Sequence, residues 1–235
     1  MKIIPLHNFL YHNLKQEHCI SIIGGGGKTT LLYTLGKIFS KQHKTILTTT
    51  THMMKPTHIP IPQLCLEEDI EIVKQINNLL YIALPFQGQK LKGPCESFLA
   101  QSLSYCEYMF IEADGAKCLD IKFERNDEPA VPSFCDCVIQ VVGIRALGKT
   151  LKECLHRYEL ATQAFHWKED DILDEEKLIT LIKHNFSHTS CKRKIVIINQ
   201  IDTQYDLSYI KKLKKLTAFE IWFCSLHNNI LISTI

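Results

Sequence analysis

The sequence has no long apolar run and no large excess of charge of either sign. Its 27 Lys and Arg residues face 25 Asp and Glu, which gives the 235 residues a formal net charge of +2. The densest basic group, 211–215, is predicted as a solvated helix face and not as a nucleic-acid surface. No stretch approaches the roughly 18 apolar residues of a membrane-spanning helix. We therefore expect neither nucleic acid nor a membrane among the partners.

The sequence also lacks the features of a secreted, disulfide-bonded protein, although it contains ten cysteines. Pro5 and the polar residues after it interrupt the opening segment before the apolar core of a signal peptide could form. Cys19 and Cys224 fall in predicted strands, where a free thiol packs as a small apolar side chain. Cys135 and Cys137 form the one close pair, without a second pair at metal-ligand spacing. These features predict a reduced, cytoplasmic protein.

What the sequence does contain is a regular alternation of apolar runs and segments with helical periodicity. The apolar runs predict buried parallel strands, and the periodic segments predict helices that cover both faces of the sheet. The predicted strands are 19–23, 45–49, 80–84, 108–113, 137–142, 194–198 and 220–224. The predicted helical segments are 29–41, 67–77, 96–103, 149–165, 174–184 and 207–216. The fold class is thus α/β, a mainly parallel sheet flanked by helices in a single P-loop NTPase-like domain over residues 1–235.

Glycine is scarce, but four of the ten glycines are consecutive. They lie between the first predicted strand and the first predicted helix, and the cradle they begin reads Gly24, Gly25, Gly26, Gly27, Lys28, Thr29, Thr30. A glycine run here lets backbone N–H groups converge on a phosphate at the positive end of the helix. Lys28 would reach the β- and γ-phosphates, and the Thr29 hydroxyl would coordinate Mg²⁺.

The glycine loop is shorter than the full P-loop pattern G-x-x-x-x-G-K-[ST], which requires glycine where this chain has Ile22. The shorter G-x-x-G-K-T pattern resembles the loops of the ATP-binding Mur ligases. The alternative is a flexible turn that happens to precede Lys28. The strand before the loop and the helix after it favour the phosphate cradle.

A second candidate element is the strand at 108–113, which ends in the acids Glu112 and Asp114. An apolar strand with carboxylates at its carboxyl end is typical of a Walker B strand, because ligands of open α/β sheets bind at that end. Glu112 and Gly115 also reproduce the spacing of the D-x-x-G motif of GTPases. One acid would hold Mg²⁺ and the other would position the attacking water, in an order that the sequence does not assign. The alternative is a pair of strand-end acids bonded to loop amides.

Two other strand ends carry polar side chains. The threonines at 48–51 could complete a magnesium shell or extend an edge strand, and the sequence favours neither. Asn199 and Asp202 reproduce the guanine-binding N-K-x-D motif with Gln200 in place of the lysine. In that motif the aspartate would accept hydrogen bonds from guanine, and the asparagine would brace the loop. The alternative is that Asn199 and Asp202 make turn and capping hydrogen bonds.

These segments together resemble the YqeC family over nearly the whole chain. The most distinctive segment, E-A-D-G-A-K, spans 112–117. A basic residue, Lys122, follows it, and then the E-P-A-V-P segment at 128–132. The A-L-G segment at 146–148 and the His156–Arg157 pair also match. The sequence departs from the family pattern at Cys118, where a proline is usual.

The resemblance implies an accessory protein for selenium-dependent molybdenum hydroxylases and implies that Lys117 and the 128–132 loop belong to the site. From the residues alone, Lys117 lies just past the acidic strand end, within reach of a phosphate or of an anionic second substrate. The leading prediction is a Mg²⁺-dependent protein that binds and hydrolyses ATP or GTP. A molybdenum hydroxylase or its cofactor is the expected partner. The alternatives are an ATP-dependent kinase or ligase acting on a small anionic metabolite, and a nucleotide-sensing module without turnover.

Overall fold

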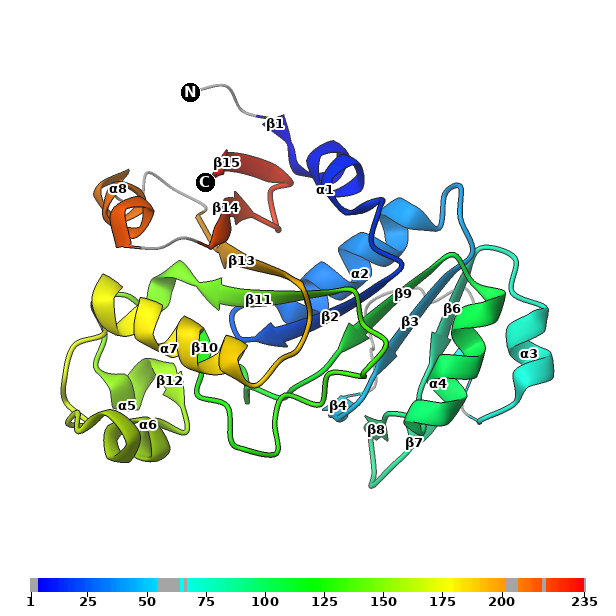
Figure 1. The fold of residues 1–235 in the computed structure, drawn as a ribbon, viewed down its shortest axis with the longest axis horizontal. Coiled ribbons are helices and arrows are strands. Elements are labelled where there is room, and N and C mark those ends of the chain that lie inside the picture. The colour runs from blue at the N-terminus through cyan, green and yellow to red at the C-terminus, as the bar shows by residue number, and fades with distance from the viewer. Residues whose placement is uncertain (1–3, 55–63, 66, 202–206, 217–218, 235) are drawn as a thin grey trace.

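A computed structural model of the chain describes residues 4–54, 64–65, 67–201, 207–216 and 219–234. These residues form a large mixed sheet with helices on both faces (Figure 1). In spatial order its strands are β1 (Ile4–Pro5), β15 (Ile230–Thr234), β14 (Glu220–Ser225), β13 (Arg193–Asn199), β11 (Cys137–Gly143), β2 (Cys19–Gly24), β9 (Tyr108–Glu112), β3 (Thr45–Thr49), β6 (Leu79–Ile82) and β5 (Leu64–Cys65). All neighbours from β14 to β5 are parallel, and β15 and β1 extend the sheet antiparallel. The predicted α/β fold with a mainly parallel sheet is confirmed.

The helices are α1 (Leu6–Leu14), α2 (Lys28–Phe39), α3 (Ile70–Lys74), α4 (Glu96–Ser102), α5 (Leu151–Cys154), α6 (Tyr158–Phe165), α7 (Glu175–Ser187) and α8 (Leu207–Leu216), with short 3₁₀ turns at Leu103–Tyr105 and Ile144–Ala146. Among the described residues, no helix is both long and apolar enough to cross a bilayer. Two small sheets complete the structure. One pairs β10 (Ile121–Lys122) with β12 (Leu155–His156), and the other joins β4 (His52–Met54), β8 (Lys90–Lys92) and β7 (Leu84–Pro85).

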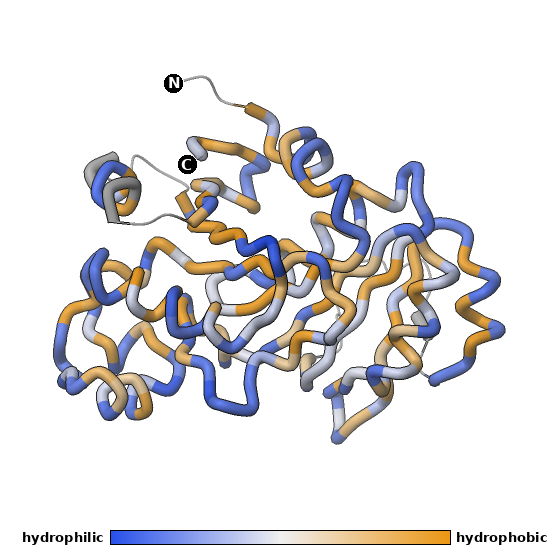
Figure 2. Tube along the Cα trace, viewed as in Figure 1, coloured by the Kyte–Doolittle hydropathy of each residue, from blue (hydrophilic) through white to orange (hydrophobic). Residues whose placement is uncertain are grey.

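The sheet separates two apolar cores. Helices α1 and α2 pack on one face, where residues such as Leu10, Leu35 and Phe39 meet the strands. Helices α3 to α8 pack on the other face, around residues such as Val196 and Phe223. In Figure 2 the central strands are coloured mainly as hydrophobic, and hydrophilic colour is concentrated in the connecting segments. Strands covered on both faces explain why the apolar runs in the sequence are continuous and not alternating.

The structure differs from the sequence prediction at three helices. The helix predicted over 67–77 is reduced to α3, which begins after the Asp69 cap. The segment 149–165 is broken because Leu155–His156 pairs with β10 and Arg157 adopts a left-handed conformation with φ of 67°. An N-terminal helix, α1, was not predicted. Its Leu6, Leu10 and Leu14 recur every four residues and are buried, so the periodic signal was present.

The carboxyl ends of β2, β9, β11 and β13 meet at one edge of the sheet, because these strands are parallel neighbours. Helix α2 begins directly at this edge, four residues after the end of β2. The glycine loop, the acidic strand end and Asn199 are therefore brought together by the sheet topology alone. In α/β sheets this edge is where ligands bind.

Candidate functional site

A cleft of about 950 Å³ opens at this edge of the sheet. The glycine loop with the start of α2 forms its centre. Residues after β13 and β14 line one part of it, including Asn199, Gln200 and His227. The segment after β9 and the β12–α6 junction line another part. The cleft thus unites segments that are up to 200 residues apart in the chain.

The backbone of the glycine loop explains why glycine is needed there. Gly27 has a φ of 134°, a backbone conformation that residues with a Cβ atom rarely adopt. A Cβ on Gly25 would lie 2.4 Å from the carbonyl oxygen of Leu119, so the loop that follows β9 packs directly on the glycine loop. A flexible turn would not require such close contacts, so these contacts argue against the flexible-turn alternative.

The backbone N–H groups of the loop fall into two sets. Those of Gly24, Gly25 and Gly26 donate to Asp114, to the Val141 carbonyl and to the Leu119 carbonyl. The next four are the N–H groups of Gly27, Lys28, Thr29 and Thr30, and none of the described residues accepts a hydrogen bond from them. Four unpaired donors at the positive end of a twelve-residue helix are an arrangement that suits an anion.

Lys28 and Asp114 are joined beneath the loop. The Lys28 ammonium lies 3.0 Å from Asp114 Oδ1 and donates to the Gly24 carbonyl at 2.6 Å. Asp114 is 0% exposed, and it does not line the cleft. Burial opposes its charge, but Lys28 and Lys122 together keep the pKa of Asp114 below its ordinary value. Asp114 therefore acts as a buried anchor for Lys28 and for the Gly24 N–H group.

Glu112 faces the cleft on the other side of the same strand end. The Thr29 hydroxyl donates to Glu112 Oε2 at 2.8 Å, which places the two predicted magnesium ligands together. Burial raises the pKa of Glu112 above its ordinary value, although Lys28 and Thr29 act in the opposite direction. A buried carboxylate with too little positive charge nearby favours a cation. Of the two acids, Glu112 lines the cleft and Asp114 does not.

A network of buried charges extends from Asp114 away from the cradle. The Lys122 ammonium, 0% exposed, lies 3.5 Å from Asp114, 2.7 Å from Glu124 and 2.8 Å from Glu128. Arg157 forms a bidentate ion pair with Glu128. Its Nη2 donates to Oε1 at 2.8 Å, and its Nη1 contacts Oε2. Against the cost of burial, Arg157 and Lys122 lower the pKa of Glu128 to about 2. The ion pairs thus connect Lys28 with Arg157 without a gap.

Glu124 is the exception in this network because it keeps its proton. Burial and the neighbouring Asp114 raise its pKa to about 10, against an ordinary value of 4.5. The sequence prediction missed Glu124, although Lys122 and Glu124 are two residues apart on an extended segment, a spacing that places side chains on one face. The network therefore holds one neutral carboxyl among ionised groups.

Glu124→Gln is expected to stabilise the protein increasingly as pH rises. Between the two pKa values the unfolded chain has lost a proton that the folded chain keeps, so the free energy of unfolding of the parent falls by about 1.4 kcal/mol per pH unit. Glutamine does not titrate, so it stays neutral in both the folded and the unfolded chain at every pH. Urea unfolding at about pH 5 and about pH 9 measures the difference. Glu159→Gln, at an exposed residue, is the control. Parallel profiles for the Glu124 variant and the parent would show that Glu124 is ionised in the fold.

Asn199 braces the cradle from the end of β13. Its Nδ2 donates to the Gly26 carbonyl at 2.8 Å, and its Oδ1 accepts from the Leu226 N–H at 2.9 Å. Gln200 donates to Asp120 at 2.9 Å, which fastens the loop after β9 to the end of β13. Asp202 lies outside the described residues, so its predicted contact with a base stays a prediction. The bracing that the sequence predicted for the asparagine is present.

The threonines at 48–51 mainly have a structural role, because three of them donate hydrogen bonds to backbone carbonyls. Thr48 donates to the Ile82 carbonyl, Thr49 to the Glu112 carbonyl and Thr50 to the Ala130 carbonyl. Thr51 is the member that lines the cleft. Lys117 lines it too, exposed and with a φ of 47°, and no described residue pairs with it. Arg157 also reaches the cleft, but its guanidinium is occupied by Glu128.

The fold and this cleft define an α/β protein whose polar site is built around a glycine loop at the carboxyl edge of a parallel sheet. A family model described as "YqeC protein" matches residues 20–159, more than half of the chain. The uncharacterized protein YqeC of Escherichia coli (strain K12) is 31% identical over 180 residues, covering 72% of this chain and 69% of that relative. The chain belongs to the YqeC family. No solved structure matches it.

Proposed function

We propose that this protein is a P-loop NTPase that binds a nucleoside triphosphate with Mg²⁺ at the glycine loop and hydrolyses it. The observation that carries the proposal is the set of four unpaired N–H groups at the start of α2, flanked by Lys28 and by the Thr29–Glu112 pair. These groups supply donors, a cation and metal ligands at one point, which is what a bound triphosphate requires.

The residues fit a magnesium ion that is coordinated partly by the protein and partly by the phosphates of the nucleotide. No group of three or more His, Cys, Asp or Glu side chains at metal-binding positions occurs among the described residues. Mg²⁺ is commonly held by one or two protein ligands together with substrate phosphates, and Thr29 and Glu112 provide such a pair. The bound ion would neutralise the charge that develops on the phosphates during transfer.

Each residue around the phosphates has a separate role in this proposal. Lys28 leaves Asp114 and turns to the β- and γ-phosphates, while Asp114 keeps Lys122 as its counter-ion at 3.5 Å. The buried aspartate is therefore not left without a positive partner. Asn199 holds the glycine loop in place during this exchange. We place the nucleoside over the ends of β13 and β14, beside Gln200 and His227.

The client of such an NTPase is a separate part of the proposal. The resemblance to the YqeC pattern favours a role in the maturation of selenium-dependent molybdenum hydroxylases. We propose that the cycle of binding and hydrolysis changes the loops after β3 and β9, and with them the affinity for such an enzyme or its cofactor. Both loops contribute residues to the cleft, including Thr51 and Lys117.

Glu112→Gln tests the magnesium part of the site. The parent is expected to bind ATP or GTP more tightly with Mg²⁺ than in EDTA. In the variant, the factor by which Mg²⁺ raises the nucleotide affinity should be at least about ten-fold smaller, because an amide is a poor ligand for Mg²⁺. Titration calorimetry with and without Mg²⁺ measures both quantities. Glu107→Gln, at the exposed residue before β9, is the matched control. An unchanged enhancement in the Glu112 variant would remove Glu112 from the metal site.

Phosphate release separates hydrolysis from the alternatives. Steady release from Mg-ATP or Mg-GTP without any acceptor supports the NTPase. Release that depends strictly on an added metabolite supports a kinase or ligase, for which the extent of the cleft beyond the cradle leaves room. Tight binding without release in either setting supports a nucleotide-sensing module.

A further inference from the structure

The part of the cleft beyond the acidic strand end is not needed to hold a nucleotide at the cradle. It is lined by residues that we call the lysine lobe: Gly115, Ala116, Lys117, Cys118 and His156. The nucleoside position proposed above lies over β13 and β14, while the lobe is formed by the segment after β9 and by β12. A triphosphate in the cradle would leave this lobe accessible beside its phosphates.

The lysine lobe offers backbone donors without partners. Lys117 and Cys118 have φ values of 47° and 62°, and the Leu119 N–H donates to the Ala116 carbonyl, so the segment is a tight turn with both central residues left-handed. No described residue accepts a hydrogen bond from the N–H groups of residues 115–118. Successive unpaired N–H groups of this kind form concavities that bind anions.

The charges around the lobe do not balance. The three cations of the buried network, Lys28, Lys122 and Arg157, share two ionised carboxylates, those of Asp114 and Glu128, because Glu124 stays protonated. Burial, Arg157, Lys122 and Lys117 together lower the pKa of His156 to about 4, so this side chain is neutral near pH 7. Lys117 itself has no ion-pair partner among the described residues. The network behind the lobe therefore carries an excess of positive charge, and Lys117 adds a cation to the lobe that no described carboxylate pairs with.

We propose that the lysine lobe binds a second small oxyanion, bearing a phosphate or carboxylate group, next to the triphosphate. Lys117 supplies the charge, and the N–H groups of residues 115–118 supply the directional hydrogen bonds. The proposal rests on the proposed function only for the presence of the nucleotide. The chain of ion pairs that starts at Lys28 in the cradle ends at Arg157, the residue that follows His156 of the lobe.

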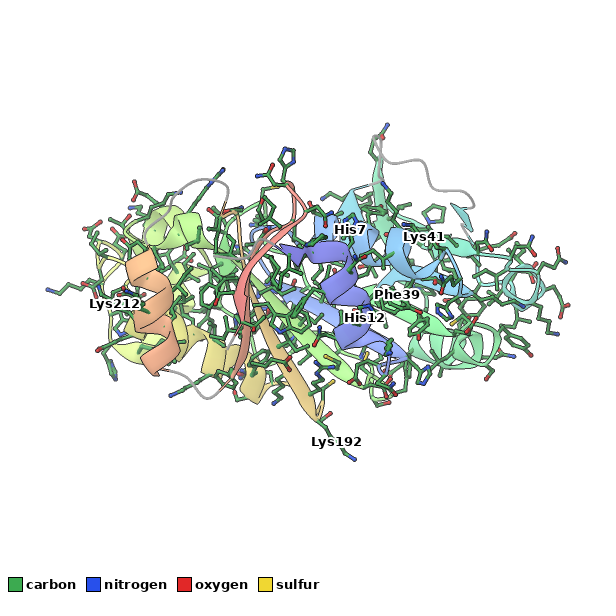
Figure 3. All side chains as sticks on the ribbon, turned by 90° about the horizontal axis from the view of Figure 1, so that it is seen from above. His7, His12, Phe39, Lys41, Lys192 and Lys212 are labelled. Atoms are coloured by element: carbon green, nitrogen blue, oxygen red, sulfur yellow. The ribbon has the colours of Figure 1, made fainter. Side chains whose placement is uncertain are left out.

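Titration with inorganic phosphate tests the lobe. The protein is first saturated with Mg²⁺ and a non-hydrolysable ATP analogue, which fills the cradle. One phosphate is then expected to bind, and Lys117→Gln should weaken this binding at least about ten-fold because it removes the lobe's lysine, which pairs with no described residue. Lys41→Gln is the matched control: Lys41, labelled in Figure 3, is an exposed lysine beyond the far end of α2, roughly 18 Å from the cradle. Malonate replaces phosphate in a second arm, to identify the preferred oxyanion.

The outcomes separate this proposal from the proposed function. If phosphate binding disappears on saturation with the analogue, the cradle is the phosphate site and the lobe proposal is overturned. The lobe proposal is also overturned if the Lys117→Gln and Lys41→Gln variants bind phosphate equally. It is overturned as well if Lys117→Gln weakens the binding of the ATP analogue but not the binding of phosphate. If the analogue fails to bind, the nucleotide proposal fails. The same phosphate titration in a Lys28→Ala background then still decides whether the lobe binds an oxyanion.

Discussion

Lys28→Ala is expected to lower the affinity for Mg-ATP and Mg-GTP by about 100-fold or more. The ammonium is 6% exposed, beside the unpaired N–H groups at the start of α2, and no second described lysine has this position. A hydrogen bond to a charged group contributes about 1.5–3 kcal/mol, and a buried ion pair with a phosphate lies at the upper end. Equilibrium binding to the purified variant measures the loss.

The variant is expected to stay folded, because Asp114 keeps Lys122 and the Gly24 N–H group as partners. Circular dichroism and the unfolding midpoint check this. Lys41→Ala, at the opposite end of α2, should bind nucleotide like the parent. A Lys28 variant that is folded and still binds Mg-NTP with parental affinity would show that the glycine loop is not the phosphate cradle.

Lys122→Met is expected to destabilise the protein by about 3–5 kcal/mol. Removing one partner from a buried set of ion pairs weakens the compensation of the charges that remain, and a penalty of this size is typical. Lys122 is 0% exposed and is the common partner of Asp114, Glu124 and Glu128. Urea unfolding at neutral pH measures the change in the free energy of unfolding.

Two further variants make this result specific. Lys149→Met removes a lysine that is 48% exposed and lies 3.9 Å from Asp120, so it should cost less than about 1 kcal/mol. Adding Glu128→Gln to Lys122→Met also takes the carboxylate partner from Arg157 and should increase the loss. If Lys122→Met costs no more than Lys149→Met, the network does not stabilise the fold.

The cradle residues were predictable because their signal is local. A strand, a run of glycines, Lys28 and a helix follow one another within twenty residues, and each part restricts the others. Glu112 was predictable for the same reason, as an acid at the end of an apolar strand. Asn199 was found through its motif, and its brace to the Gly26 carbonyl agrees with the predicted role.

The sequence prediction failed where partners are distant in the chain. Arg157 was placed inside a helix because the apolar spacing around it is helical. In the structure it is left-handed and is held by Glu128, 29 residues away. Glu124 carries no motif, and its retained proton depends on burial next to Asp114. Neither feature can be derived from a local pattern.

The sequence by itself determined the α/β class, the position of the glycine loop and the acidic end of the strand. The spacing of apolar residues, the glycine run and the side chains at a strand end are all properties of short segments. Only the tertiary structure distinguishes the surroundings of the two acids. It buries Asp114 under Lys28 and turns Glu112 toward Thr29, a difference that depends on which neighbours the sheet order supplies. The same sheet order brings the turn at residues 116–119 against the glycine loop, and so places an unpaired lysine beside the cradle.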